Sequence, residues 1–134
     1  MSHENVEVAR RIVAAWNTGG VNALLEFCPA DVVWHPFAEW PDGGEPRTGH
    51  AGVRELMGAW TDNFDGYQVE VHDFHDLEDR VLVHGEMTGK AKGSGVPIAQ
   101  PLGWICSDFR DGQIGEVRFF VTWEETLEAA GLRA

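Results

Sequence analysis

The stretch that decides the fold is YQVEVHDFHDLEDRVLVHGEM, residues 67–87. Apolar side chains alternate with polar ones in both halves, at positions 67, 69 and 71 and again at 81, 83 and 87. A period of two is typical of β-strands with one buried face. The acidic residues between the halves, including Glu78 and Asp79, favour a solvated turn. The sequence therefore predicts a β-hairpin here.

More strands follow this hairpin along the chain. A break at Gly93-Ser94-Gly95-Val96-Pro97 separates it from a strand predicted over 101–110. Asp111-Gly112 is a strong signal for a two-residue hairpin turn into a last strand over 113–121. Thr122-Trp123-Glu124-Glu125 then matches a capping box, which predicts a C-terminal helix.

The first half of the chain has helical periodicity instead. Amphipathic spacing predicts helices over 4–17, 21–27 and 50–64, and the β-branched and aromatic run Val32-Val33-Trp34-His35 predicts a short edge strand. Residues 36–49 are rich in Pro and Gly and predict a mobile aromatic loop. The predicted order is ααβαββββα in one α+β domain over 1–134. A curved, mostly antiparallel sheet wrapping its helices forms a cone whose open end is an apolar pocket.

Composition excludes several classes of function. Ten Lys and Arg against 22 Asp and Glu give a net charge of −12, which disfavours nucleic acid and anionic membranes as partners. The two cysteines have no metal-ligand spacing, and we expect a reducing cytoplasm. His72 and His75 would point to opposite faces of a strand, so no metal site is predicted. No nucleotide-binding or hydrolase motif occurs, and we expect no cofactor.

Three local strings resemble a known superfamily. They are Gly44-Glu45-Pro46-Arg47-Thr48-Gly49, Asp31-Val32-Val33-Trp34-His35-Pro36 and Phe109-Arg110-Asp111-Gly112-Gln113-Ile114. With the element order, they resemble the NTF2-like superfamily over nearly the whole chain, particularly the SnoaL-like polyketide cyclases and ketosteroid isomerase. The resemblance implies the helix-filled cone, a hydrophobic small-molecule ligand and a homodimer. It does not fix the chemistry, because this scaffold hosts enzymes and noncatalytic binders.

The resemblance also suggests one catalytic residue. The isomerase's general base matches His35, and a neutral imidazole is a competent base near pH 7. The position of its first oxyanion donor matches Ile12 or Arg11 and that of the second matches Ile105, and neither isoleucine can donate a hydrogen bond. We therefore expect His35 to point into the cone as its only titratable side chain, and ketosteroid isomerisation by the family mechanism is not expected.

Large apolar side chains on the inner face are the candidate ligand contacts. These substrate-binding candidates are Trp16, Phe37, Trp40, Met57, Trp60, Phe64, Ile105 and Phe119. If His35, Ile105 and Phe119 point inward, then Trp34, Trp104 and Phe120 form an apolar patch on the convex face. Such a patch usually marks an interface, so it predicts a homodimer through that face.

Two functions stay open at this point. The first is a cofactor-independent enzyme of the isomerase, cyclase or dehydratase type, in which His35 moves a proton on a hydrophobic substrate. The second is a noncatalytic domain whose cone binds a hydrophobic ligand or is filled by its own side chains, because one base without an oxyanion donor is an incomplete active site.

Overall fold

The computed structural model describes residues 2–37 and 44–132. Helix α1 (Ser2–Leu24) and the 3-10 helix η1 (Leu25–Phe27) come first, followed by strands β1 (Val33–His35) and β2 (Arg47–Thr48) and helix α2 (Gly49–Thr61). Strands β3 (Phe64–Asp76), β4 (Arg80–Ala91), β5 (Pro97–Arg110) and β6 (Gln113–Phe120) precede helix α3 (Trp123–Ala129). The predicted order is confirmed, with β2 as an addition.

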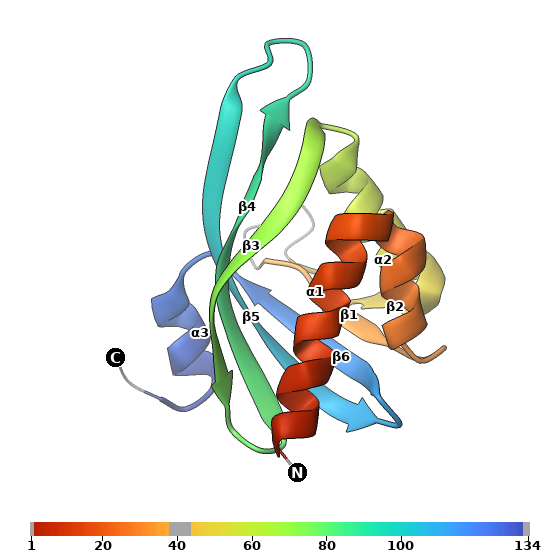
Figure 1. Cartoon of the computed structure of the whole chain (residues 1–134), viewed down its shortest axis with the longest axis vertical. Coiled ribbons are helices and arrows are strands. Elements are labelled where there is room, and N and C mark those ends of the chain that lie inside the picture. Colours follow the sequence, from red (N-terminus) through yellow and green to blue (C-terminus); the bar gives the residue numbers. More distant parts are fainter. Residues whose placement is uncertain (1, 38–43, 133–134) are drawn as a thin grey trace.

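The strands form one curved, open sheet in the order β2-β1-β6-β5-β4-β3. Strand β1 pairs with β6 in parallel, and the other neighbouring strands of the sheet are antiparallel. Helices α1 and α2 lie together over one side of the sheet, and α3 lies apart from them (Figure 1). The long hairpin of β4 and β5 extends beyond the helices at the top of that view. The predicted α+β class is therefore confirmed.

Local sequence signals account for several element boundaries. Gly20 has φ 72°, outside the helical region, and this break separates the main part of α1 from its last turn. Asp111 and Gly112, at φ 49° and 77°, make the predicted tight turn between β5 and β6. The Thr122 side chain accepts a hydrogen bond from the backbone N–H of Glu125, so the predicted cap of α3 is present.

The core lies on the inner face of the sheet. The pairing of the strands shows which residues face it and corrects two predictions. Trp34 pairs with Val117, and Trp104 pairs with Phe119. Both tryptophans are buried in the main core cluster, at 4% and 5% exposure. They therefore point inward, and the prediction of a convex-face patch containing Trp34 and Trp104 is wrong.

His35 and Ile105 lie on the opposite, outer face. His35 pairs with Arg118, and Arg118 pairs with Ile105, so these three residues share one side of the sheet. The predictions that His35 and Ile105 point into the cone are wrong. A strand of three residues with apolar side chains on both faces does not fix its own register, and a slip of one residue exchanges the faces.

Helix α3 covers part of the outer face. Ile105 packs there with Leu82 and Ala130, and Phe120 and Trp123 pack against this second cluster. A Cβ atom on Gly103 would lie 2.1 Å from Oγ1 of the fully buried Thr126, so α3 sits directly on β5. Leu82 and Ile105 are thus buried within the chain, and Phe120 is partly covered. Of the predicted patch only Phe120 lies on this face, so the argument for a dimer through Trp34 and Trp104 falls away, and the homodimer stays a prediction.

Candidate functional site

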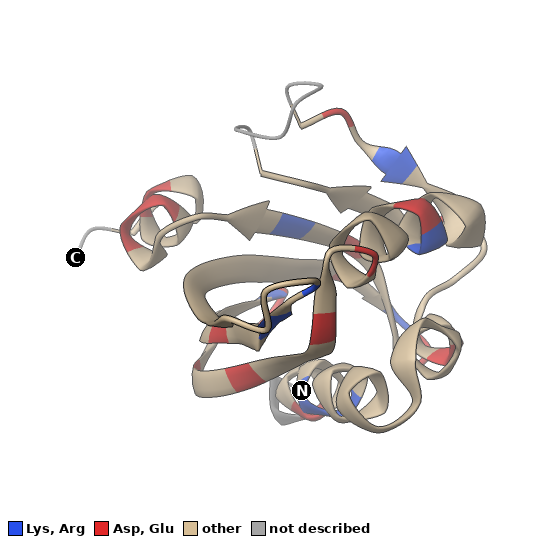
Figure 2. Ribbon diagram, turned by 90° about the horizontal axis from the view of Figure 1, so that it is seen from above, with Lys and Arg blue, Asp and Glu red and all other residues tan. Residues whose placement is uncertain are grey.

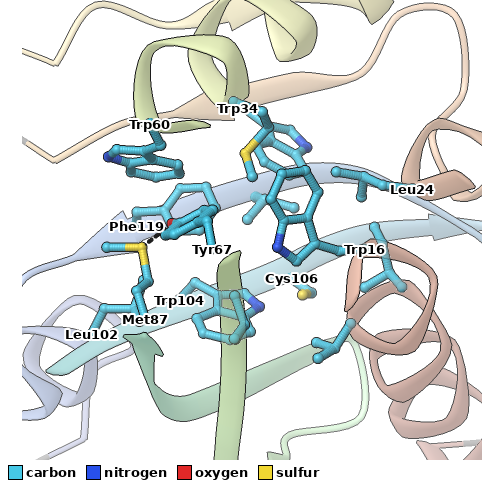
Figure 3. A pocket seen from close by; sticks show the side chains of 15 residues that line it. Trp16, Leu24, Trp34, Trp60, Tyr67, Met87, Leu102, Trp104, Cys106 and Phe119 are labelled. Carbon is cyan, nitrogen blue, oxygen red and sulfur yellow. Dashed lines mark hydrogen bonds between the residues drawn. The ribbon is translucent and has the colours of Figure 1, made fainter. Parts of the chain in front are cut away.

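A cavity of about 60 Å³ lies between the helices and the inner face of the sheet. Its walls come from α1, α2, β1 and the four strands β3 to β6 (Figure 3). The described lining residues are mostly apolar or aromatic: Ile12, Val13, Trp16, Leu24, Trp34, Met57, Trp60, Tyr67, Val69, Met87, Leu102, Trp104, Cys106, Val117 and Phe119. None of these is an Asp, Glu, His, Lys or Arg.

Aromatic rings give the cavity a well-defined shape. The Trp60 ring meets Phe119 edge to face, with centroids 5.6 Å apart, and Trp16 meets Tyr67 in the same way at 5.6 Å. Trp34 also packs against Phe119, at 5.3 Å. Pairs of this kind contribute roughly 0.5–1.5 kcal/mol each beyond burial of their area. The rings on this part of the wall therefore hold one another in place.

Among the described lining residues, two carry titratable groups, and both groups stay protonated near neutral pH. Burial raises the pKa of the Tyr67 hydroxyl, which donates a hydrogen bond to Sδ of Met87 (Figure 3). Burial also raises the pKa of the Cys106 thiol to about 12, although a hydrogen bond from Trp104 partly opposes this. The prediction of His35 as the only titratable group of the cone is therefore wrong.

Two indole nitrogens of the lining have no hydrogen-bond partner among the described residues. They are Nε1 of Trp16 and Nε1 of Trp34, both fully shielded from solvent. Their residues are 8% and 4% exposed. Buried N–H groups normally have partners, so two orphaned donors in one cavity are a distinctive feature of its wall.

Four of the predicted ligand contacts line the cavity: Trp16, Met57, Trp60 and Phe119. Phe37 is buried next to it, with its ring 5.9 Å from that of Trp60. Phe64 is not on α2 as predicted, because the helix ends at Thr61, and it stacks on Tyr67 from the start of β3. Ile105 lies on the outer face, and Trp40 lies outside the described residues.

His35 hydrogen-bonds to Glu116 instead of facing the cavity. Its Nε2 lies 2.6 Å from Oε2 of Glu116, and the same carboxylate oxygen lies 3.9 Å from the Arg118 guanidinium. The His35 and Glu116 side chains are 20% and 38% exposed. This pair belongs to the outer surface, so His35 has no direct access to a molecule in the cavity.

Sequence reasoning missed several lining residues, although a signal existed for some. Tyr67 and Val69 share the apolar face of the alternating stretch, and Met87 shares the apolar face of its second half. Assigning this apolar face to the inner side of the cone would have predicted all three as lining residues. Trp34 and Trp104 were missed because the register of their strands was assigned one residue out.

A bulge changes the arrangement of the histidines on the outer face. The register of β3 shifts between Val71 and Asp73. His72 therefore lies against His84, with ring centroids 5.6 Å apart. The ring centroids of His75 and His84 lie 5.0 Å and 4.9 Å from that of Trp123. The prediction that His72 and His75 point to opposite faces assumed unbroken alternation. In the described part of the chain, no three His, Cys, Asp or Glu side chains are grouped to hold a metal ion.

Charge is spread over the surface. In Figure 2, acidic segments occur on helices and strands around the molecule, with basic segments between them. Across the described residues, no helix combines the length and hydrophobicity needed to cross a bilayer.

Comparison with known families identifies the fold. A model of the SnoaL-like domain matches residues 9–117, which is most of the chain. The chain belongs to the SnoaL-like family. A search of curated protein sequences found no match.

Solved structures similar to this SnoaL-like domain share its fold at low sequence identity. A hypothetical protein with a ketosteroid isomerase-like fold from Catenulispora acidiphila, in complex with trimethylamine, is 21% identical with a TM-score of 0.73, covering 94% of this chain and 93% of that one. A SnoaL-like polyketide cyclase from Jannaschia is 21% identical with a TM-score of 0.74, at 88% and 85% coverage. TerC, co-crystallised with polyporic acid, is 20% identical with a TM-score of 0.74, at 96% and 97% coverage.

Proposed function

We propose that this SnoaL-like domain binds a small, uncharged, apolar molecule in the cavity between its helices and the inner face of the sheet. The observation that carries the proposal is the lining itself, which is apolar and aromatic and contains no charged side chain among its described residues. A charged ligand would lose its hydration there without gaining an ionic partner. An apolar ligand gains from the same surface.

The cavity volume limits the size of the ligand. A volume of about 60 Å³ is well below the roughly 300 Å³ or more of a typical ligand site. Met57 and Met87 line the cavity, and the unbranched methionine side chain repacks more readily than other apolar side chains. We expect Met57 to move aside for a one-ring ligand, whereas Met87 is held by the hydrogen bond from Tyr67. The co-crystallisation of TerC, which shares this fold, with polyporic acid supports a small-molecule ligand.

A second candidate is proton transfer of the isomerase, cyclase or dehydratase type on the same bound molecule, without a cofactor. The Tyr67 hydroxyl favours it, because burial keeps that group protonated and able to donate a hydrogen bond to developing negative charge. This reaction also needs a proton acceptor, and the described lining offers neither a carboxylate nor an imidazole. Binding is therefore the function that the geometry supports best.

A cavity-filling variant tests the binding function. Val13 is half-buried on α1 and lines the cavity, so Val13→Phe is expected to place a ring in the space that a ligand needs. The probe is α-methylstyrene, titrated against the methyl signals of Met57 and Met87 in ¹³C NMR spectra. We expect its affinity to fall at least about tenfold, since a filled cavity loses most of the apolar contact area.

The matched control is Val6→Phe, which makes the same change at a half-buried position of α1 that does not line the cavity. It should bind the probe as the unsubstituted protein does. If α-methylstyrene fails to shift either methionine signal in the unsubstituted protein, the binding function is wrong.

A further inference from the structure

Some polar atoms in the cavity wall have a hydrogen-bond partner, and two indole nitrogens have none among the described residues. The Tyr67 hydroxyl is committed to Sδ of Met87, and the Trp104 side chain hydrogen-bonds to Cys106. The buried N–H groups of Trp16 and Trp34 remain without a partner in the described structure. The wall therefore presents two unused N–H donors, and its unused acceptors are the lone pairs of the Tyr67 hydroxyl oxygen and weakly accepting sulfur atoms.

The two unused donors are held in fixed positions. Trp16 comes from α1, and its ring is fixed against Tyr67, whereas Trp34 comes from β1, and its ring is fixed against Phe119. In Figure 3, the Trp16 nitrogen is turned toward the middle of the group of labelled side chains. The Trp60 nitrogen, by contrast, lies on the outer side of that group. A molecule in the middle of the cavity would meet the Trp16 donor directly.

We propose that the indole N–H groups of Trp16 and Trp34 are the specificity-determining donors of this site, and that they select a ligand carrying an uncharged hydrogen-bond acceptor on an apolar body. This inference rests on the proposed binding function. A buried donor that gains an acceptor is stabilised, and a hydrocarbon of the same shape leaves it unsatisfied. The acceptor is uncharged because no cationic side chain stands among the described lining residues to balance an anion.

A pair of probes of similar shape separates the hydrogen bond from the indole donors from the apolar contacts that the cavity makes with any ligand. Acetophenone and α-methylstyrene have the same size and shape, but only acetophenone carries a carbonyl acceptor. The measurement is the ratio of their affinities, from the Met57 and Met87 methyl signals, in the unsubstituted protein and in Trp16→Phe and Trp34→Phe. Phenylalanine keeps an aromatic ring and removes the N–H group.

The preference for acetophenone is expected to fall about fivefold or more in Trp16→Phe, and further in the double variant, since one such hydrogen bond corresponds to roughly that factor. The ratio cancels any general loss of affinity that comes from the smaller ring. Trp60→Phe is the matched control. It removes an indole from the same cavity, but not one of the two orphaned donors, so it should leave the ratio unchanged.

The outcomes separate the two proposals. If neither probe binds, the binding function itself fails. If both probes bind and the ratio is the same in the unsubstituted protein and in the Trp16 and Trp34 variants, the cavity is a binding site and the selection by indole donors is overturned. An equal fall of the ratio in Trp60→Phe would also overturn it, because ring size would then be the cause.

Discussion

Replacement of Trp104 by Glu is expected to unfold the protein and not to dissociate a dimer. Trp104 is 5% exposed and packs against Phe119 in the main core. Removing its ring costs about 3–5 kcal/mol, and the new carboxylate would lie in an apolar cavity wall whose described residues include no cation. Together these effects exceed about 4 kcal/mol, a large part of the stability of a domain of this size.

Chemical denaturation followed by circular dichroism measures this effect. The control is Val96→Glu, which introduces the same charge at a residue that is 55% exposed, and it should change the free energy of unfolding by less than about 0.5 kcal/mol. A Trp104→Glu protein that keeps its stability, and differs only in its sedimentation, would place Trp104 on the convex face after all.

Alkaline pH is expected to destabilise the protein steeply. Burial raises the pKa of Cys28 and Cys106 from an ordinary value of about 9 to about 12. Between these values the unfolded chain releases the thiol protons and the folded chain keeps them, so stability is complete below pH 9 and is lost as the pH rises. The slope is about 1.4 kcal/mol per pH unit for each thiol, or about 4 kcal/mol for both by pH 10.5.

The alanine double variant of these cysteines isolates that contribution. Its stability at pH 8 will be lower, because two buried side chains are shortened, but the decline of its free energy of unfolding above pH 9 should be much shallower. Burial also raises the pKa of Tyr67, which adds a residual slope in both proteins. Equal slopes for the two proteins between pH 9 and pH 11 would show that the thiols titrate normally in the fold.

The elements of the fold were predictable because each has a local signal. The period-two stretch over 67–87 became a strand pair, the Asp111-Gly112 turn joined the last two strands, and Thr122 capped the last helix. Strand β2 was not predicted. It has two residues, and its pairing with β1 depends on where the rest of the chain places that edge.

The site was predictable only in part, because its composition depends on which face each strand turns inward. Trp16, Met57 and Trp60 were found because helical spacing assigns a buried face within one segment. His35 and Ile105 were assigned to the wrong face, since their strands are apolar on both sides and pairing partners decide their register. The bulge after Val71 likewise has no clear local signal.

The most direct test of the cavity as a binding site is the ¹H–¹⁵N NMR spectrum of the indole N–H groups during titration with acetophenone. The chain has six tryptophans, and the signals of Trp16 and Trp34 can be assigned from their Phe variants. Trp123 serves as an internal control, because it stacks on His84 at the outer face. We predict that the Trp16 and Trp34 protons move downfield to saturation and that Trp123 does not move. Unchanged Trp16 and Trp34 signals at saturating acetophenone, or movement of Trp123 alone, would contradict a binding site in this cavity.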